Sequence, residues 1–151
     1  MEQAIEPEKR KLLEAFDAAG DGGALSLAAR GGERAMAEEM VTRGWLRRAS
    51  QPDTYRRTED GRLAVAGALD VTLYTRAGCH LCDEAKAQIA PLVAGAGGRL
   101  REVNIDEEPE LRERYNVDVP VIFLGARKVA KHRVDVRQFR RQLEDAKRSL
   151  G

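Results

Sequence analysis

Cys79 and Cys82 are the only two cysteines in this chain of 151 residues, and two residues separate them. They follow a run of β-branched and aromatic residues (71–75) that is typical of a short buried strand. A helix-like stretch then runs from residue 83 to about residue 93. Two thiols at this spacing can cycle between the reduced pair and a disulfide. The pair therefore predicts redox chemistry carried by sulfur.

The position of the pair gives its two sulfurs different roles. Cys79 is expected at the N-terminus of a helix, where unpaired N–H groups and the helix dipole stabilise a thiolate. We expect Cys79 to attack a substrate disulfide and Cys82, one helical turn later, to resolve the mixed disulfide. A zinc site is the weaker alternative, because it needs four ligands and only His80 and His132 are available besides the cysteines. We expect no metal here.

Arg76 and His80 flank the attacking thiol and are candidate substrate-binding residues. A positive charge on either side chain favours the thiolate of Cys79. Two interpretations of Arg76 stay open, a contribution to the thiolate and a solvated surface charge. We expect His80 to tune the thiol rather than to transfer protons.

The elements around the pair predict an α/β domain. A strand, a helix and a second strand imply a right-handed parallel crossover, and two adjacent strands near the end imply an antiparallel pair. Together they give a four-stranded mixed sheet flanked by helices. The expected strands are residues 71–75, 100–105, 121–124 and 128–132, and the expected helices are residues 81–93, 107–115 (capped by Asp106) and 136–148.

Two motifs resemble the glutaredoxin-like branch of the thioredoxin superfamily. They are residues 74–82 (YTRAGCHLC) and residues 118–121 (DVPV), and the resemblance runs from Asp70 to the C-terminus. It implies a thioredoxin fold and thiol-disulfide oxidoreductase activity. It also implies a cis Pro120 facing the dithiol, with the backbone of Val119 left to pair with a substrate or with glutathione. Without the resemblance, Pro120 reads as a proline at the start of a strand.

Departures from the family pattern leave the substrate open. Glutaredoxins often carry proline and an aromatic residue between the cysteines, where this chain has His80 and Leu81. A glycine-rich turn before the last helix is replaced by residues 131–135. Two interpretations stay open here: Asp135 only caps the final helix, or Lys131 and Arg133 meet a glutathione carboxylate. The partner is a protein disulfide or glutathione as co-substrate, and no tightly bound cofactor is expected.

Residues 1–67 predict a separate winged-helix-like domain in front of the glutaredoxin-like domain of residues 68–151. The motifs that carry this resemblance are residues 43–46 (RGWL) and 55–62 (YRRTEDGR). Thr58 is expected to cap a helix that begins at Glu59. The other expected elements are helices at residues 7–19, 25–29 and 33–43, a turn at residues 21–23, and hairpin strands at residues 45–48 and 55–58.

The charge of this first segment argues against DNA as its partner. Residues 1–67 hold 11 Lys and Arg against 12 Asp and Glu, a net charge of −1. The helix that would enter the major groove carries Glu33, Glu38 and Glu39 beside Arg34. A module that docks proteins or presents substrates is favoured. A redox-sensing DNA-binding regulator and a glutathione-dependent iron-sulfur carrier are the alternative functions.

The composition predicts a cytoplasmic protein without a membrane partner. The net charge is +1, with 34% charged and 42% hydrophobic residues. No apolar run approaches the ~18 residues that can span a bilayer. The first seven residues lack the basic start and apolar centre of a secretory signal. In the cytoplasm a catalytic disulfide is more typical than a structural one.

Overall fold

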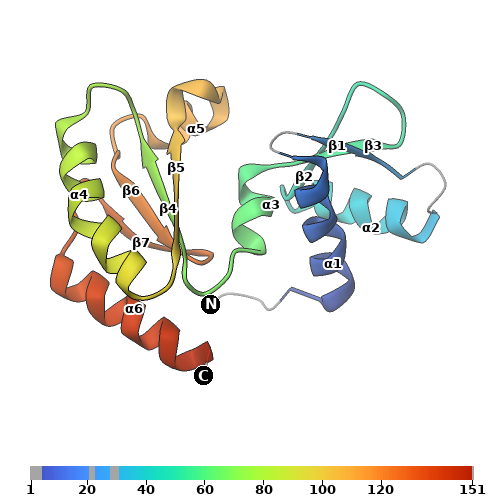
Figure 1. Cartoon of the computed structure of the whole chain (residues 1–151). Helices are drawn as coiled ribbons and strands as arrows, with labels where there is room; N and C mark the ends of the chain where they lie inside the picture. The colour runs from blue at the N-terminus through green and yellow to red at the C-terminus, as the bar shows by residue number, and fades with distance from the viewer. Residues whose placement is uncertain (1–4, 21–22, 28–30, 151) are drawn as a thin grey trace. The chain divides into compact units, whose positions relative to one another are not determined.

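Two units make up the chain, Met1–Ala66 and Gly67–Gly151, and each is described by itself. The computed structural model describes residues 5–20, 23–27 and 31–150 (Figure 1). Within these ranges no helix has both the length and the apolar character needed to cross a bilayer.

The second unit is built on a four-stranded mixed sheet. Its strands are β4 (Asp70–Thr75), β5 (Arg99–Asn104), β6 (Val121–Leu124) and β7 (Arg127–Lys131), in the order β5-β4-β6-β7. β4 and β5 run parallel, whereas β6 is antiparallel to both β4 and β7. The predicted mixed sheet of a thioredoxin fold is confirmed.

Helices flank both faces of this sheet. α4 (His80–Gly95) and α6 (Val136–Leu150) lie together on one side, and α5 (Pro109–Tyr115) lies on the other (Figure 1). Because side chains alternate along a strand, Leu73 faces the core beneath α4 and α6 while its neighbour Tyr74 stacks on Tyr115 of α5. The buried core of the first side consists of Val71, Leu73, Ala85, Ile89, Val93, Ile122, Leu124, Phe139 and Leu143.

The predicted cap at Asp106 is wrong. A short 3₁₀ helix, η2 (Ile105–Glu107), follows β5, and the Asn104 side chain accepts a hydrogen bond from the Asp106 N–H at 2.9 Å. α5 begins only at Pro109, whose missing N–H and fixed φ suit the first turn of a helix. The Asp106 carboxylate instead turns toward Arg76.

The first unit combines helices with a small antiparallel sheet. Its helices are α1 (Pro7–Ala15), a 3₁₀ turn η1 (Phe16–Ala19), α2 (Gly31–Thr42) and α3 (Glu59–Ala64). Its strands are β1 (Ala24–Ser26), β2 (Leu46–Arg48) and β3 (Thr54–Arg57), in the order β1-β3-β2. The buried core consists of Leu12, Leu13, Phe16, Leu27, Ala37, Met40, Leu46 and Tyr55.

Local predictions for this unit had mixed outcomes. The cap is confirmed, since Thr58 Oγ1 accepts a hydrogen bond from the Gly61 N–H at 3.0 Å. The helix expected at residues 25–29 is wrong at its start, because Leu25 belongs to β1 and pairs with Tyr55 of β3. Residues 28 and 29 of that helix, and residues 21 and 22 of the expected turn, lie outside the described residues. The winged-helix assignment stays a prediction.

Candidate functional site

Cys79 is the N-cap of α4, the first helix after the central strand β4. Its extended backbone, with φ −90° and ψ 109°, ends the loop, and its Sγ accepts a hydrogen bond from the Cys82 N–H at 3.2 Å. Gly78 before it has φ 77°, in the left-handed region that suits glycine. The sequence thus turns sharply from strand to helix and places the Cys79 sulfur at the N-terminus of α4, where the Cys82 N–H binds it.

A disulfide joins Cys79 to Cys82, with the two Cα atoms 5.2 Å apart. The two cysteines differ in exposure, since Cys82 is 1% exposed whereas Cys79 is only half-buried. Cys82 packs inside the unit because it lies on the same face of α4 as the core residues Ala85 and Ile89. Of the two sulfurs, that of Cys79 is therefore the one that a partner can approach.

Arg76 fastens the loop between β4 and the cysteines to the rest of the unit. Its Nη2 and Nε donate to the two carboxylate oxygens of Asp106, at 2.7 and 3.2 Å. Its Nη1 donates to the backbone oxygen and the side-chain oxygen of Asn116, at 3.1 and 2.8 Å. The hydrogen bond from Arg76 holds the pKa of the Asp106 carboxyl below its ordinary value. The guanidinium is thus partnered, an arrangement that neither interpretation of Arg76 described.

The Val119–Pro120 peptide bond is cis, and both residues are buried. The register pairs Tyr74 of β4 with Val121 of β6, so Pro120 lies at the same end of the sheet as the loop that carries the cysteines. The His132 N–H donates to the backbone oxygens of Asp118 and Pro120, at 3.1 and 2.9 Å. Within the described part of the chain, no hydrogen bond uses the backbone N–H or C=O of Val119.

The other candidate residues lie at the same end of the sheet. His80 is exposed at the first position of α4. Lys131 ends β7 and Arg133 follows it, both exposed. Asp135 Oδ1 accepts a hydrogen bond from the Gln138 N–H at 3.1 Å, which confirms the capping interpretation of this residue. The roles of His80 and Arg133 toward a substrate stay predictions.

Several contacts at this end of the sheet have no local signal in the sequence. Asp106 and Asn116 hold Arg76 from 30 and 40 residues away. His132 Nε2 lies 3.7 Å from Asp118 Oδ1, and its backbone is in the left-handed region with φ 66°. Only the fold brings these residues together.

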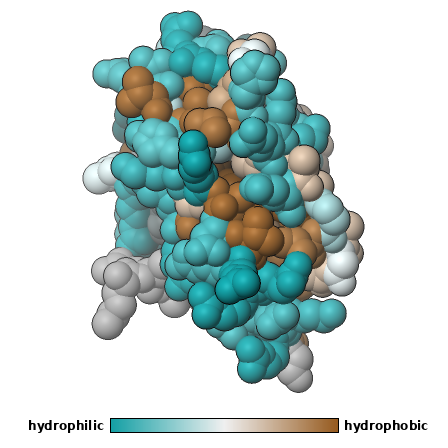
Figure 2. Space-filling view, turned by 90° about the vertical axis from the view of Figure 1, so that its left-hand side faces the viewer, coloured by the Kyte–Doolittle hydropathy of each residue, from teal (hydrophilic) through white to brown (hydrophobic). Residues whose placement is uncertain are grey.

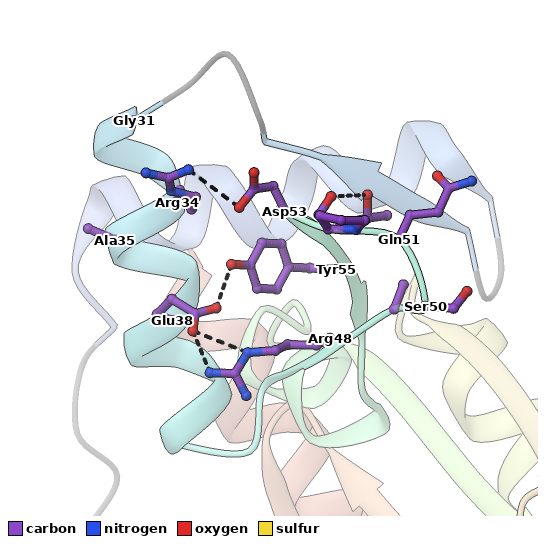
Figure 3. A pocket seen from close by; sticks show the side chains of 12 residues that line it. Gly31, Arg34, Ala35, Glu38, Arg48, Ser50, Gln51, Asp53 and Tyr55 are labelled. Carbon is purple, nitrogen blue, oxygen red and sulfur yellow. Dashed lines mark hydrogen bonds and ion pairs between the residues drawn. The ribbon is translucent and has the colours of Figure 1, made fainter.

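The first unit holds a hollow of about 510 Å³ between α2 and the β2–β3 hairpin. Figure 3 shows that its charged side chains point toward one another. Arg34 Nη1 lies 3.4 Å from Asp53 Oδ1, and Glu38 accepts hydrogen bonds from Arg48 and from the Tyr55 hydroxyl. The charges of this hollow are therefore largely compensated from within.

Burial and this network shift the acidity of two groups in the hollow. Desolvation of the buried ring, and then its hydrogen bond to Glu38, raise the pKa of Tyr55 to about 12. The hydrogen bond from Arg48, followed by that from Tyr55, holds the pKa of the Glu38 carboxyl below its ordinary value. Among residues 5–20, 23–27 and 31–150, no three His, Cys, Asp or Glu side chains gather as metal ligands.

A known protein family matches most of the second unit, and a curated relative matches a stretch of similar length. The family described as "Glutaredoxin-like domain (DUF836)" matches residues 70–144. A curated glutaredoxin-like protein of Dictyostelium discoideum is 32% identical over 74 residues, which cover 45% of this chain and 68% of the relative.

Solved structures of similar proteins cover about half of the chain. A structural genomics target protein from X. campestris is 33% identical, with a TM-score of 0.43, and the match covers 50% of this chain and 96% of that one. A protein from Nitrosomonas europaea is 30% identical, with a TM-score of 0.42, and the match covers 46% of this chain and 85% of that one.

Proposed function

This chain belongs to the family of glutaredoxin-like domains, and on that premise we propose that it is a thiol-disulfide oxidoreductase. Its substrate is a protein disulfide or a mixed disulfide of a protein with glutathione. The observation that carries the proposal is the unequal exposure of Cys79 and Cys82 at the N-terminus of α4. One sulfur is open to a partner and the other is within reach of the first.

The reaction begins from the reduced pair. The Cys79 thiolate attacks one sulfur of the substrate disulfide, so that the substrate S–S bond breaks, a mixed disulfide with Cys79 forms, and the leaving sulfur takes up a proton. Cys82 then loses its proton and attacks Cys79, releasing the second substrate thiol and forming the Cys79–Cys82 disulfide. Two electrons pass from the pair to the substrate, and two glutathione molecules or another dithiol reduce the pair again.

The loop of Val119 and Pro120 provides the docking edge for the partner. The N–H and C=O of Val119 have no hydrogen-bond partner within the described residues, so they are available to an extended substrate backbone. The loop also lies at the end of the sheet that carries the cysteines. His80 and Arg133, both exposed, are the side chains that we assign to a charged group of the substrate, such as a glutathione carboxylate.

Serine variants of the two cysteines test this assignment. With a protein disulfide as substrate, both Cys79→Ser and Cys82→Ser should lose multiple turnover, but only Cys82→Ser should accumulate a mixed disulfide detectable by intact mass. Reduction at the native rate by Cys79→Ser would rule out the mechanism.

The same pair of variants distinguishes the two substrate classes. External glutathione can release a glutathione mixed disulfide from Cys79 without help from Cys82. If glutathione is the co-substrate, Cys82→Ser should retain turnover of a glutathionylated peptide. If only protein disulfides are reduced, Cys82→Ser should be inactive toward both substrates.

A further inference from the structure

The C-terminal segment of the second unit concentrates positive charge. Residues 125–151 hold nine Lys and Arg against three Asp and Glu, a net charge of +6, whereas residues 67–124 hold six against ten, a net charge of −4. The nine basic side chains are all exposed. We call them the basic surface: Arg127, Lys128, Lys131, Arg133, Arg137, Arg140, Arg141, Lys147 and Arg148.

The charges of the basic surface are largely uncompensated. Within the described residues, Arg148 is the only one of the nine in an ion pair, with Asp145 at 2.8 Å. Elsewhere in the unit, basic side chains do find carboxylates: Arg76 binds Asp106 and Lys86 binds Glu102. The basic surface therefore differs from the rest of the unit in the sign of its net charge, and most of its side chains have no carboxylate partner within the described residues.

Lys131 is the member of the basic surface that the strand register places nearest the reactive pair. Tyr74 pairs with Val121, and Val121 pairs with Lys131, so Lys131 lies two strands from the end of β4, about 10 Å at the usual strand spacing. α6 begins at Val136, after the four residues that follow Lys131, and its exposed basic residues continue to Arg148. Figure 2 shows a largely hydrophilic lower face on this side of the molecule, with hydrophobic surface higher up.

We propose that the basic surface docks an acidic segment of the protein whose disulfide is reduced. This inference rests on the proposed function, and it assigns the substrate class as proteins with Asp and Glu close to the reactive cysteine. The helical spacing places Arg137 and Arg141 on one stripe of α6, where they can meet carboxylates of one extended segment.

The charge distribution favours an acidic protein over nucleic acid or an anionic membrane. A domain that binds such polyanions typically has a strongly basic overall balance, whereas residues 67–151 have a net charge of only +2. At physiological salt the field of a local cluster is screened within a Debye length of about 8 Å. A short acidic segment that touches the cluster directly is therefore the partner that fits.

The test uses the full chain and three disulfide substrates. Two peptides share one disulfide loop and carry a tail of four Asp and Glu or of four Lys and Arg, and the third substrate is the small uncharged hydroxyethyl disulfide. At low salt the acidic peptide should have a kcat/KM about ten-fold above that of the basic peptide, and 0.5 M NaCl should reduce this ratio. Arg137→Glu with Arg141→Glu should abolish or reverse the preference.

A matched pair of substitutions controls for the net charge. Arg47→Glu with Arg112→Glu makes the same change in charge at exposed positions outside the basic surface, and the preference should persist. Arg137→Gln with Arg141→Gln should give an intermediate loss without introducing negative charge. All variants should reduce hydroxyethyl disulfide at the wild-type rate.

Each remaining outcome overturns a specific statement. Equal kcat/KM for the two peptides, or a preference that survives Arg137→Glu with Arg141→Glu, would refute the docking surface while leaving the proposed function intact. Failure of the wild type to reduce any of the three substrates would refute the proposed function itself. Stronger inhibition by duplex DNA or phosphatidylserine vesicles than by a disulfide-free acidic peptide would refute the acidic protein segment as the partner and would indicate nucleic acid or an anionic membrane instead.

Discussion

Arg76 binds Asp106 through both carboxylate oxygens, with N–O distances of 2.7 and 3.2 Å. Such a bidentate ion pair fixes the relative orientation of the two groups as well as compensating their charges, because the guanidinium and the carboxylate are both planar. The same guanidinium also bonds Asn116, just before the loop of the cis proline. Arg76 therefore connects the loop that ends at Cys79 with the loop that ends at Pro120.

The pair of Arg76 and Asp106 should make the stability of the protein depend on pH in the acidic range. Because Arg76 lowers the pKa of the folded Asp106, the pair stabilises the fold fully above the ordinary carboxyl pKa. That stabilisation is lost as the pH falls through the lowered folded value. Asp106→Asn should destabilise the protein at pH 7. Urea midpoints measured between pH 7 and pH 2 give the stability as a function of pH, and their fall at low pH (the acid branch) should be smaller in Asp106→Asn than in the wild type.

Glu113→Gln is the control, since it removes an exposed carboxylate from neighbouring α5. It should leave the acid branch of the urea midpoints close to that of the wild type. An identical acid branch in wild type and Asp106→Asn would contradict the assigned role of the pair.

The two cysteines of the reduced protein should react at different rates with an alkylating agent. Cys79 is half-buried at the end of α4, whereas Cys82 is 1% exposed and can react only after local opening. We expect iodoacetamide to modify Cys82 at a rate roughly ten-fold or more below that of Cys79 in the folded state. Timed quenching followed by peptide mass spectrometry gives the two rates.

Urea supplies the control for this comparison, because unfolding exposes both thiols and should bring the two rates close together. Faster modification of Cys82 than of Cys79 in the native protein would contradict the assignment of attacker and resolver.

The sheet of the second unit could be predicted because its signals are local. β6 begins and ends at the predicted residues, since Val121–Leu124 is an apolar run between Pro120 and Gly125. β1 could not be predicted in this way. Ala24–Ser26 is too short to show a period, and it becomes a strand because β3 offers it an edge.

The reactive pair could be predicted from two residues and their spacing, but its surroundings could not. Asp106 has the local pattern of a helix cap, and an arginine 30 residues away overrides that preference. The cis state of Pro120 followed only from the family resemblance, because most bonds before proline are trans. Local sequence indicates what a side chain can do, and the fold selects the partner.

Two glycines of the first unit should respond to alanine in opposite directions. A Cβ at Gly61 would lie 2.1 Å from the Trp45 backbone oxygen, so Gly61→Ala should destabilise the protein by about 1–3 kcal/mol through overpacking. Gly32, in α2, has no atom within 4 Å of such a Cβ. Gly32→Ala should therefore stabilise by about 0.5–1 kcal/mol, because the unfolded chain loses conformational freedom.

Urea unfolding of both variants, followed by the fluorescence of Trp45, the only tryptophan, measures these changes in the first unit. Equal midpoints for Gly61→Ala and Gly32→Ala would contradict the close approach of α3 to the Trp45 backbone.

Tyr55 should make the stability of the protein depend on pH in the alkaline range. Its pKa is raised by burial to about 12, so the folded state retains a proton that the unfolded state loses above about 10. The stabilisation is thus complete below pH 10 and is lost as the pH rises through about 12. Tyr55→Phe should flatten this alkaline branch of the urea midpoints, and it should cost about 1–2 kcal/mol at pH 7 through the lost hydrogen bond to Glu38.

A double-mutant cycle separates this hydrogen bond from the packing of the ring. In a Glu38→Gln background, the additional cost of Tyr55→Phe at pH 7 should fall, because the carboxylate that strengthens the bond is absent. Arg48 contributes to the same network, since it also donates to Glu38, and it keeps that carboxylate partnered in Tyr55→Phe. The single variant should therefore fold normally. An unchanged cost in the two backgrounds would show that the hydroxyl stabilises the fold independently of Glu38.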